Sequence, residues 1–252
     1  MAPEQNVNDA SARVRREERL ALGIVFGAIG TAALASLFVA LSPAVRPKGV
    51  LPQQRVVPVS QRADLASDVR AAIASAHASA ARADDVAAEA EALVARVRAG
   101  RGRGGAAFAR LKLPDGRAYE GEANGALPEG VGVMRGGVVA LAVGFFVDGV
   151  RSGAGADCAN PDCTGASYFG DFRANAPTGA ARVTFPDGGV YRGEVRDGAP
   201  DGFGELVRAD GSRYAGAFTA GRRDGHGVET SPAGVASRGF WTADQLSEGP
   251  LP

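Results

Sequence analysis

Apolar residues follow three different spacings along the chain of 252 residues, and each spacing predicts a different structure. Between Leu20 and Leu41 every residue is apolar or small and none is charged. From about Ser60 to Ala99, apolar and small residues recur at alternating steps of four and three, the spacing of one helix face. From Ala107 onward, large side chains alternate with glycine, which indicates strands. The pattern predicts a membrane-length segment, one long helix and a β-rich region.

The uncharged segment 20–41 is long enough to cross a hydrocarbon core of about 30 Å at about 1.5 Å per residue. We therefore expect a transmembrane helix at 20–41 after a short cytoplasmic tail at 1–19. A cleaved signal peptide is the alternative, with Ser42-Pro43-Ala44 as a poor cleavage site. Arginines before the segment favour a cytoplasmic N-terminus. Gly23 and Gly27 have the Gly-x-x-x-Gly spacing that permits close helix packing.

Residues 42–59 contain four prolines and predict an extended linker, whereas the alanine-rich residues 60–99 predict a helix. One side of this helix forms a seam with a/d spacing: Leu65, Val69, Ala72, Ala76, Ser79, Ala83, Val86, Ala90, Leu93 and Val97. The seam is explained either by a coiled coil, which makes the chain a homo-oligomer, or by a single helix packed on a partner. Glycines and arginines at 100–106 predict a flexible joint.

A glycine recurs at nearly constant intervals through the rest of the chain. These ladder glycines are Gly121, Gly144, Gly170, Gly193, Gly216 and Gly239. Successive members are about 23 residues apart, except for a longer step between Gly144 and Gly170. Aromatic side chains stand two residues before or after most of them: Tyr119, Phe146, Tyr168, Phe172, Tyr191, Tyr214, Phe218 and Trp241. We expect each unit to be a hairpin, and successive hairpins to form an all-β repeat array, an elongated antiparallel meander with an aromatic core.

The best-formed stretch, Tyr191–Gly227, reads YRGEVRDGAPDGFGELVRADGSRYAGAFTAGRRDGHG. It resembles the MORN repeat family (membrane occupation and recognition nexus), and the resemblance extends over residues 107–241. The units that begin at Tyr191 and Tyr214 match well, and the unit at Ala142 matches least because its tyrosine is absent. The resemblance implies a twisted, half-pipe-like sheet at 107–252 that contacts proteins and, in some members, is proposed to touch lipid. With the segment 20–41, the chain resembles a membrane-anchored, bacterial member.

Cys158 and Cys163 flank the insertion that lengthens one unit, and they are the only cysteines. In an oxidising compartment they form a disulfide across this loop. Free thiols are the second interpretation. A metal site with Asp157 and Asp162 is the third, although no histidine or second cysteine pair lies nearby.

Residue types that perform chemistry are sparse. His77 lies off the helix seam, and His226 stands inside a Gly-x-Gly of the array; neither has partners for acid–base or nucleophilic catalysis. Carboxylates recur beside strand glycines (Glu120, Asp171, Glu194 and Glu205), and a solvated outer face explains them. Lysine plus arginine and aspartate plus glutamate both number 28, so no net charge favours nucleic acid. We expect neither an enzyme nor a cofactor or metal site.

The anchor, the helical spacer and the repeat surface together predict a non-catalytic scaffold that docks onto a membrane-associated protein assembly. The alternatives are a module that binds lipid or a cell-envelope polymer, and a regulatory accessory subunit of a partner enzyme. Alanine, arginine and glycine usage is typical of a GC-rich bacterium. We therefore expect a single-pass protein of the inner membrane with a periplasmic repeat domain. The irregular stretch from Ala142 to Cys163 is where we expect a specific contact.

Overall fold

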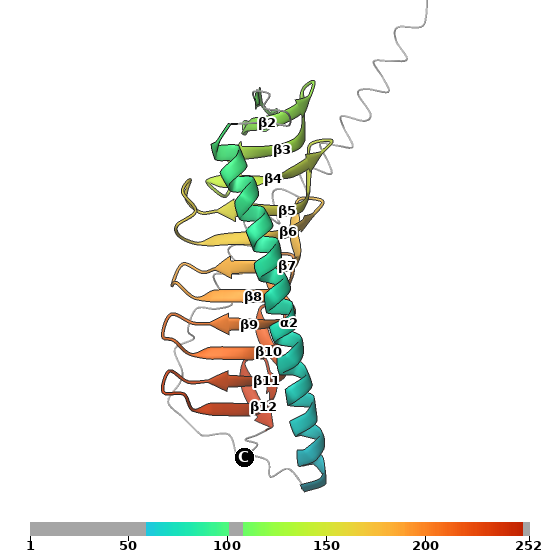
Figure 1. Ribbon diagram of the computed structural model, residues 1–252, viewed down its shortest axis with the longest axis vertical. Coiled ribbons are helices and arrows are strands. Elements are labelled where there is room, and N and C mark those ends of the chain that lie inside the picture. The colour runs from blue at the N-terminus through green and yellow to red at the C-terminus, as the bar shows by residue number, and fades with distance from the viewer. Residues whose placement is uncertain (1–58, 101–107, 249–252) are drawn as a thin grey trace, which may run out of the picture.

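The computed structural model describes residues 59–100 and 108–248, which form one long helix and thirteen strands (Figure 1). Helix α2 covers Val59–Arg98. The strands are β1 (Ala109–Lys112), β2 (Ala118–Asn124), β3 (Leu127–Arg135), β4 (Leu141–Val147), β5 (Val150–Cys158), β6 (Ser167–Arg173), β7 (Ala176–Thr184), β8 (Val190–Arg196), β9 (Ala199–Val207), β10 (Arg213–Thr219), β11 (Arg222–Thr230), β12 (Ala236–Thr242) and β13 (Gln245–Glu248). They form one sheet in chain order, and neighbours are antiparallel. The predicted meander preceded by a helix is confirmed.

The expectations for the first 58 residues lie outside the described part of the chain. These are the tail at 1–19, the transmembrane helix at 20–41 with Gly23 and Gly27, and the linker that follows. Nearly all of the joint at 100–106 also lies outside it. Neither α2 nor any other helix within residues 59–100 and 108–248 combines the length and apolar character that a bilayer crossing requires.

Two kinds of turn alternate along the array. The turns between β2 and β3, β4 and β5, and so on are called hairpin tips here; at one of them Asp148 and Gly149 have φ values of 50° and 80°. Positive φ at both central residues is typical of tight hairpin turns. Three other Asp-Gly pairs, at residues 115–116, 187–188 and 210–211, lie in turns at the opposite ends of the strands, where Gly188 has a φ of 89°.

Tyr119, Tyr191 and Tyr214 each lie across the ladder glycine of their own strand and the glycine paired with it. A Cβ added at Gly121 would stand 2.4 Å from the Tyr119 hydroxyl, and one at Gly132 would stand 2.2 Å from it. The hydroxyl donates to the carbonyl oxygen of Glu122 at 2.7 Å, where the β2–β3 register shifts by a bulge. Tyr168, Tyr191 and Tyr214 repeat this bond to the residue three positions ahead, at 2.7, 2.7 and 3.2 Å.

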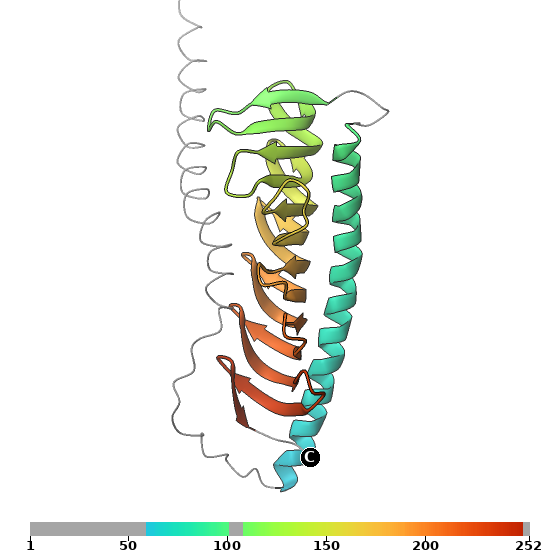
Figure 2. The same cartoon turned by 90° about the vertical axis from the view of Figure 1, so that its left-hand side faces the viewer.

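The aromatic residues line one face of the sheet in two clusters, Tyr119 with Phe146 and Tyr168 to Trp241, which together are called the spine here. Tyr191 and Tyr214 both contact Phe218 edge to face, with ring centroids 5.1 Å apart, and Tyr214 contacts Trp241 at 5.5 Å. All eight expected core residues are buried: Tyr119, Phe146, Tyr168, Phe172, Tyr191, Tyr214, Phe218 and Trp241. The strands curve away from the helix toward the tips, which gives the sheet a half-pipe shape (Figure 2).

Helix α2 lies across the other face, running from the β12 end to the β3 end of the array (Figures 1 and 2). Gly100, with a φ of 65°, follows the helix and donates its N–H to the carbonyl of Val97 at 2.9 Å. The buried helix residues are Leu65, Val69, Ala72, Ala76, Ser79, Ala80, Ala83, Ala87, Ala90, Val94 and Val97. Alanines suit this position because a small side chain lets the helix approach the sheet closely.

The helix seam is therefore covered by the chain's own sheet, and a coiled coil between copies is not supported. The buried positions also move by one residue in the second half of the helix. Ala87 and Val94 are buried there, whereas the predicted Val86 and Leu93 are only partly buried. The reason is that α2 packs on a sheet and not on a second helix. A straight helix keeps about 3.6 residues per turn, so its buried positions drift away from the strict seven-residue repeat of a supercoil.

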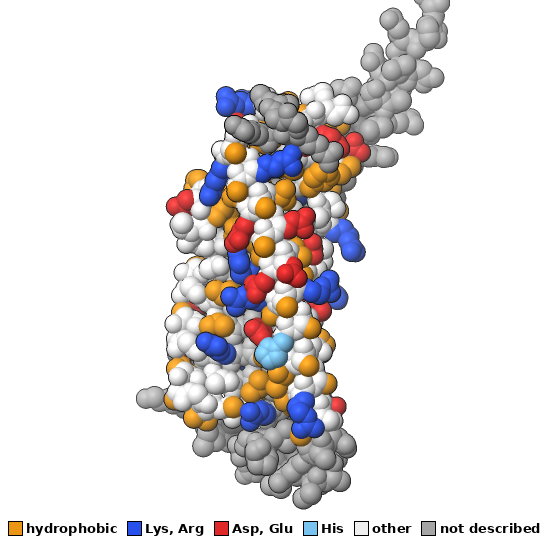
Figure 3. All heavy atoms as spheres, in the orientation of Figure 1, with side chains coloured by type: hydrophobic (Ala, Val, Ile, Leu, Met, Phe, Trp, Pro, Cys, Tyr) orange, Lys and Arg blue, Asp and Glu red, His pale blue; other side chains and the backbone are white. Residues whose placement is uncertain are grey.

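Charged pairs connect the middle of the helix to the sheet, and acidic and basic side chains gather there (Figure 3). Arg192 donates to Asp84 at 3.0 Å, and Arg182 pairs with Glu91. The sequence predicts that the carboxylates beside the strand glycines lie on a solvated face. This prediction is wrong for Glu194 and Glu205, because both bond side chains of the helix. The Ser79 hydroxyl donates to Glu194 at 3.2 Å, and His77 bonds Glu205. Glu120, in β2, pairs with Arg110 and Arg135. The Asp171 carboxylate accepts the backbone N–H of Ala180 at 3.3 Å.

Candidate docking surface

The unit that starts at Ala142 departs from the others because an arginine occupies the place of the missing tyrosine. A Cβ added at Gly144 would stand 2.5 Å from Cδ of Arg151, so this side chain lies over the ladder glycine as the tyrosines do. Its guanidinium also donates to the carbonyl oxygens of Val143 and Ala156, at 3.4 and 3.3 Å. Arg151 thus fills the gap in the spine and takes over the bonding role of the tyrosine hydroxyl.

Arg151 is 8% exposed, and its charge is balanced by Asp157. The two guanidinium nitrogens donate to the two carboxylate oxygens at 2.6 and 3.0 Å, and the guanidinium stacks on the Phe172 ring at 3.6 Å from its centroid. Such bidentate pairs hold both groups in one geometry. Asp157 is consequently a structural partner of Arg151, and no group of three or more metal-ligating side chains occurs in the described residues.

The cysteines of the insertion form a disulfide, with Cys158 and Cys163 at a Cα–Cα distance of 5.0 Å. Cys158 is buried in the core between the helix and the sheet. The enclosed loop carries Pro161, whose carbonyl oxygen accepts a hydrogen bond from Arg98 at 3.3 Å. The insertion therefore meets the end of α2 and leaves the hairpin tips, at the far ends of the strands, unobstructed.

The tips of the first two hairpins carry exposed apolar side chains. Leu127, Val147 and Val150, here called the tip patch, are 52%, 45% and 39% exposed. The two tips adjoin, because the Gly149 N–H donates to the carbonyl oxygen of Pro128 at 2.9 Å. Only two other large apolar residues are similarly exposed within the described ranges, and they lie in turns at the opposite strand ends.

Later hairpins show which residues these tip positions accept. The positions of Val147 and Val150 are occupied by Arg173 and Ala176 in the next hairpin, and by Arg196 and Ala199 in the one after. In the following hairpin they are Thr219 and Arg222. The fold thus accommodates polar residues at every tip, and the apolar patch is specific to the first two hairpins. It includes the irregular unit in which the sequence predicts a specific contact.

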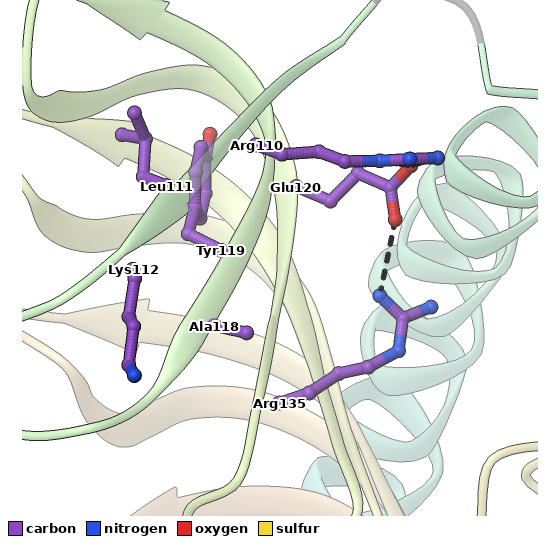
Figure 4. Close-up of a pocket in the computed structure, with 7 residues that line it drawn as sticks. All are labelled: Arg110, Leu111, Lys112, Ala118, Tyr119, Glu120 and Arg135. Carbon is purple, nitrogen blue, oxygen red and sulfur yellow. Dashed lines mark hydrogen bonds and ion pairs between the residues drawn. The ribbon is translucent and has the colours of Figure 1, made fainter.

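A basic hollow lies on the helix side of the first three strands (Figure 4). Arg110 and Arg135 both point to Glu120, at 3.3 and 3.5 Å, so one carboxylate faces two guanidinium groups. Lys112 and Ala118 also line the hollow, and no ion pair of Lys112 occurs among the described residues. The excess of positive charge makes this hollow suitable for an anionic group.

The tyrosine pKa values rise above the ordinary value at all four positions. Burial is the largest cause in each case. Nearby carboxylates, such as Glu122 for Tyr119 and Glu194 for Tyr191, raise the pKa further, whereas Arg223 lowers that of Tyr214. Their hydroxyls remain protonated donors, as the bonds to backbone carbonyl oxygens require. These shifts accordingly reflect spine packing, which accounts for them without a catalytic role.

Comparison with known families places three MORN repeats in the array, at residues 168–190, 191–213 and 214–235. The predicted repeat identity is confirmed for residues 168–235, whereas the membrane-anchored bacterial type is not shown. Repeats of this kind are typical of non-catalytic binding modules, and the comparison identifies no catalytic domain. A search of curated proteins finds no match.

Sequence reasoning located the irregular unit but missed the residues that matter in it. Arg151 and the tip patch were readable in principle, because aligning the units places Arg151 where Pro177 and Pro200 stand. It likewise places two valines where other tips have arginine, alanine or threonine. The alignment does not show that the Arg151 side chain folds back over Gly144 and fills the space left by the missing tyrosine at Ala142.

Proposed function

We propose that the protein is a non-catalytic scaffold that docks a partner protein on the tip patch while residues 20–41 anchor it in a membrane. The carrying observation is the exposed cluster of Leu127, Val147 and Val150 on a rigid array. Exposed apolar side chains that adjoin one another mark interaction sites in soluble domains. MORN repeats at 168–235 support a binding role for the whole array.

The shape of the array limits where a partner can bind. The helix covers one face of the sheet, and the aromatic spine is buried on the other. The tips remain, and their short turns lose little conformational freedom on binding. A partner that fits must offer an apolar strip at its contact, flanked by carboxylates that can meet Arg173 and Arg196 on the neighbouring tips.

The test replaces the tip patch with residues that the later hairpins use. The variant Leu127→Ala, Val147→Arg and Val150→Ala matches the third and fourth hairpins. Affinity purification of the full chain from membranes in mild detergent should recover a partner with the wild type, and at least tenfold less with the variant. The control is Thr219→Arg, which places an arginine on a tip outside the patch. Equal recovery by all three proteins, with equal melting temperatures, would refute docking at the patch.

The anchor and its orientation belong to the same proposal. The uncharged residues 20–41 and the arginines before them support a single-pass protein with a cytoplasmic N-terminus and a periplasmic array. The disulfide of Cys158 and Cys163 also fits an oxidising compartment. Alkaline carbonate should leave the protein in the membrane pellet, and protease should cut the array in spheroplasts only. Extraction into the supernatant would refute the anchor.

A second candidate function is the binding of an anionic lipid or envelope polymer, and the basic hollow favours it. Arg110 and Arg135 flank one carboxylate there, and Lys112 also lines the hollow. Residues 59–252, which keep α2 on the sheet, should then co-sediment with vesicles that contain anionic lipid, and salt should weaken the interaction because exposed charges are screened. Binding that survives in Lys112→Ala with Arg135→Ala would exclude the hollow. The third possibility, a regulatory role toward a partner enzyme, predicts that the partner recovered by affinity purification is an enzyme.

A further inference from the structure

The two ends of the array carry complementary halves of one repeat strand. In a complete unit the second strand has nine residues, as in β3 (Leu127–Arg135) and β11 (Arg222–Thr230). After β12 the structure describes β13 (Gln245–Glu248), which pairs with the tip half of β12, Phe240 to Thr242. Strand β1 (Ala109–Lys112) matches the other half, because Ala109 pairs with Gly121 as Gly227 pairs with Gly239.

The described residues consequently leave one stretch of the β12 edge unpaired. Ala236 to Gly239 pair with β11 on one side and have no strand partner on the other within the described residues. Two of the residues that follow Glu248 in the sequence are prolines, Pro250 and Pro252, and neither has a backbone N–H to donate to a ladder. The outer edge of β1 is open in the same sense, since β1 pairs only with β2 among the described strands.

We propose that copies of this chain associate head to tail, with β1 of one copy completing the last repeat of another. The register follows from the array itself, in which Gly216 pairs with Gly227 and Ala215 with Val228. Transferred to the junction, this register sets Ala109 opposite Gly239, Arg110 opposite Arg238, and Leu111 opposite Ser237. Strand β1 of one copy then runs antiparallel to β12 of the other, so the alternation of strand directions in the meander continues across the junction.

The side chains at the junction continue the aromatic spine. Leu111 packs against the Tyr119 cluster at one end of the array, and Leu246 packs against the cluster that contains Trp241 at the other end. Ser237 replaces the spine tyrosine in the last unit, so the junction has room for the leucine of the incoming strand. The contact would therefore bury apolar surface in addition to forming ladder hydrogen bonds.

The position of the helix gives independent support. In Figure 1, α2 ends level with β3 and begins beyond β12, so it extends past one end of the array and stops short of the other. Six residues precede Leu65, the first helix residue with a buried side chain described, and at about 1.5 Å per residue they span about 9 Å. Two interstrand spacings amount to nearly the same length, at about 4.8 Å each. The projecting end of α2 thus fits over β1 and β2 of the next copy.

Like charges limit the strength of this contact. Arg110 would stand directly opposite Arg238, which is unfavourable in a strand pair. The array contains the same arrangement at Arg182 and Arg192, where each arginine has a carboxylate of the helix. Arg110 retains Glu120. We therefore expect a reversible, concentration-dependent association that is independent of docking at the tip patch.

The first test is cross-linking of the full chain in mild detergent with a short bismaleimide. Arg110 and Arg238 lie on β1 and β12, about 50 Å apart within one chain at about 4.8 Å per strand. The double variant Arg110→Cys and Arg238→Cys should therefore link only between copies and give a ladder of dimer, trimer and higher species. Each single variant should give no more product than the wild type. Dimers from a single variant, or no product from the double variant, would overturn the proposal.

The second test changes the charge at the junction without adding a thiol. Arg238→Glu places a carboxylate opposite Arg110 and should tighten association roughly threefold to tenfold, measured by light scattering over a concentration series. The control is Arg213→Glu, on a strand whose edges are both paired within the chain. A dissociation constant that is unchanged or weaker in Arg238→Glu would contradict the register. Loss of partner recovery by tip-patch variants would leave both tests unaffected.

Discussion

Replacement of Arg151 tests whether an ion pair substitutes for the missing spine tyrosine. Arg151→Ala would remove a bidentate bond to Asp157, two bonds to carbonyl oxygens and a stack on Phe172. Breaking a buried pair by removing one partner costs about 3–5 kcal/mol, because the other charge stays behind without compensation. Asp157 is 14% exposed, so we expect the lower end of this range, about 3 kcal/mol.

A loss of about 3 kcal/mol corresponds to a fall in melting temperature of roughly 6–12 °C for a domain of this size. The assay is thermal unfolding followed by circular dichroism at neutral pH. Arg173→Ala is the matched control, since Arg173 is exposed at the next hairpin tip and a surface substitution changes stability by about 0.5 kcal/mol or less. The triple variant Ala142→Tyr, Arg151→Pro and Asp157→Val restores the pattern of the unit that contains Tyr168, Pro177 and Val183. Because it leaves no unpaired carboxylate, it should recover most of the loss. Equal melting temperatures for Arg151→Ala and Arg173→Ala would refute the claim that Arg151 takes the structural place of the missing tyrosine.

Three further predictions concern the spine and the helix. Gly216→Ala would place its Cβ 2.6 Å from the Cα of Gly227 and should lower the melting temperature more than Gly137→Ala, whose Cβ would meet only the Arg117 side chain at 3.7 Å; the reverse order would contradict the glycine–tyrosine packing. Burial raises the tyrosine pKa values, so the stability they contribute is complete below the unfolded value of about 10 and is lost as the pH rises above it. Tyrosinate absorbance should thus appear only together with alkaline unfolding; ionisation of the folded protein near pH 10 would contradict this. Ala83→Glu should release α2 from the sheet and speed amide hydrogen exchange along the helix, whereas Ala81→Glu on the exposed side should not. Equal exchange rates in the two variants would contradict the assignment of the buried helix face.

Much of this fold is readable from the sequence because the array repeats one local rule. A tyrosine two residues before a glycine predicts both a strand and the close approach that only a glycine allows. The same rule predicts the order of the hairpins, since each unit can bury its aromatic residues only against neighbouring units.

The helix shows where sequence reasoning ends. Small residues at steps of four and three indicate a buried face, but they are equally compatible with a second helix and with a sheet. The choice depends on Val133, Val143 and Ala156, which lie on the sheet face under the helix. Each has a buried apolar residue two positions before it in the same strand, a spacing that indicates a buried face but does not say what covers it. Likewise, Ala142 and Arg151 are separate irregularities in the sequence and become one structural unit only in the folded chain.

The measurement that tests the central claim most directly is photo-cross-linking at matched hairpin tips. A photoreactive amino acid is introduced at position 150, in the tip patch, and separately at position 199, the equivalent place in a later hairpin. In native membranes, position 150 should give a discrete cross-linked product that disappears when Val147→Arg is added, and position 199 should give none. Identical products from both positions, or none from either, would contradict a scaffold that docks its partner on the first two tips.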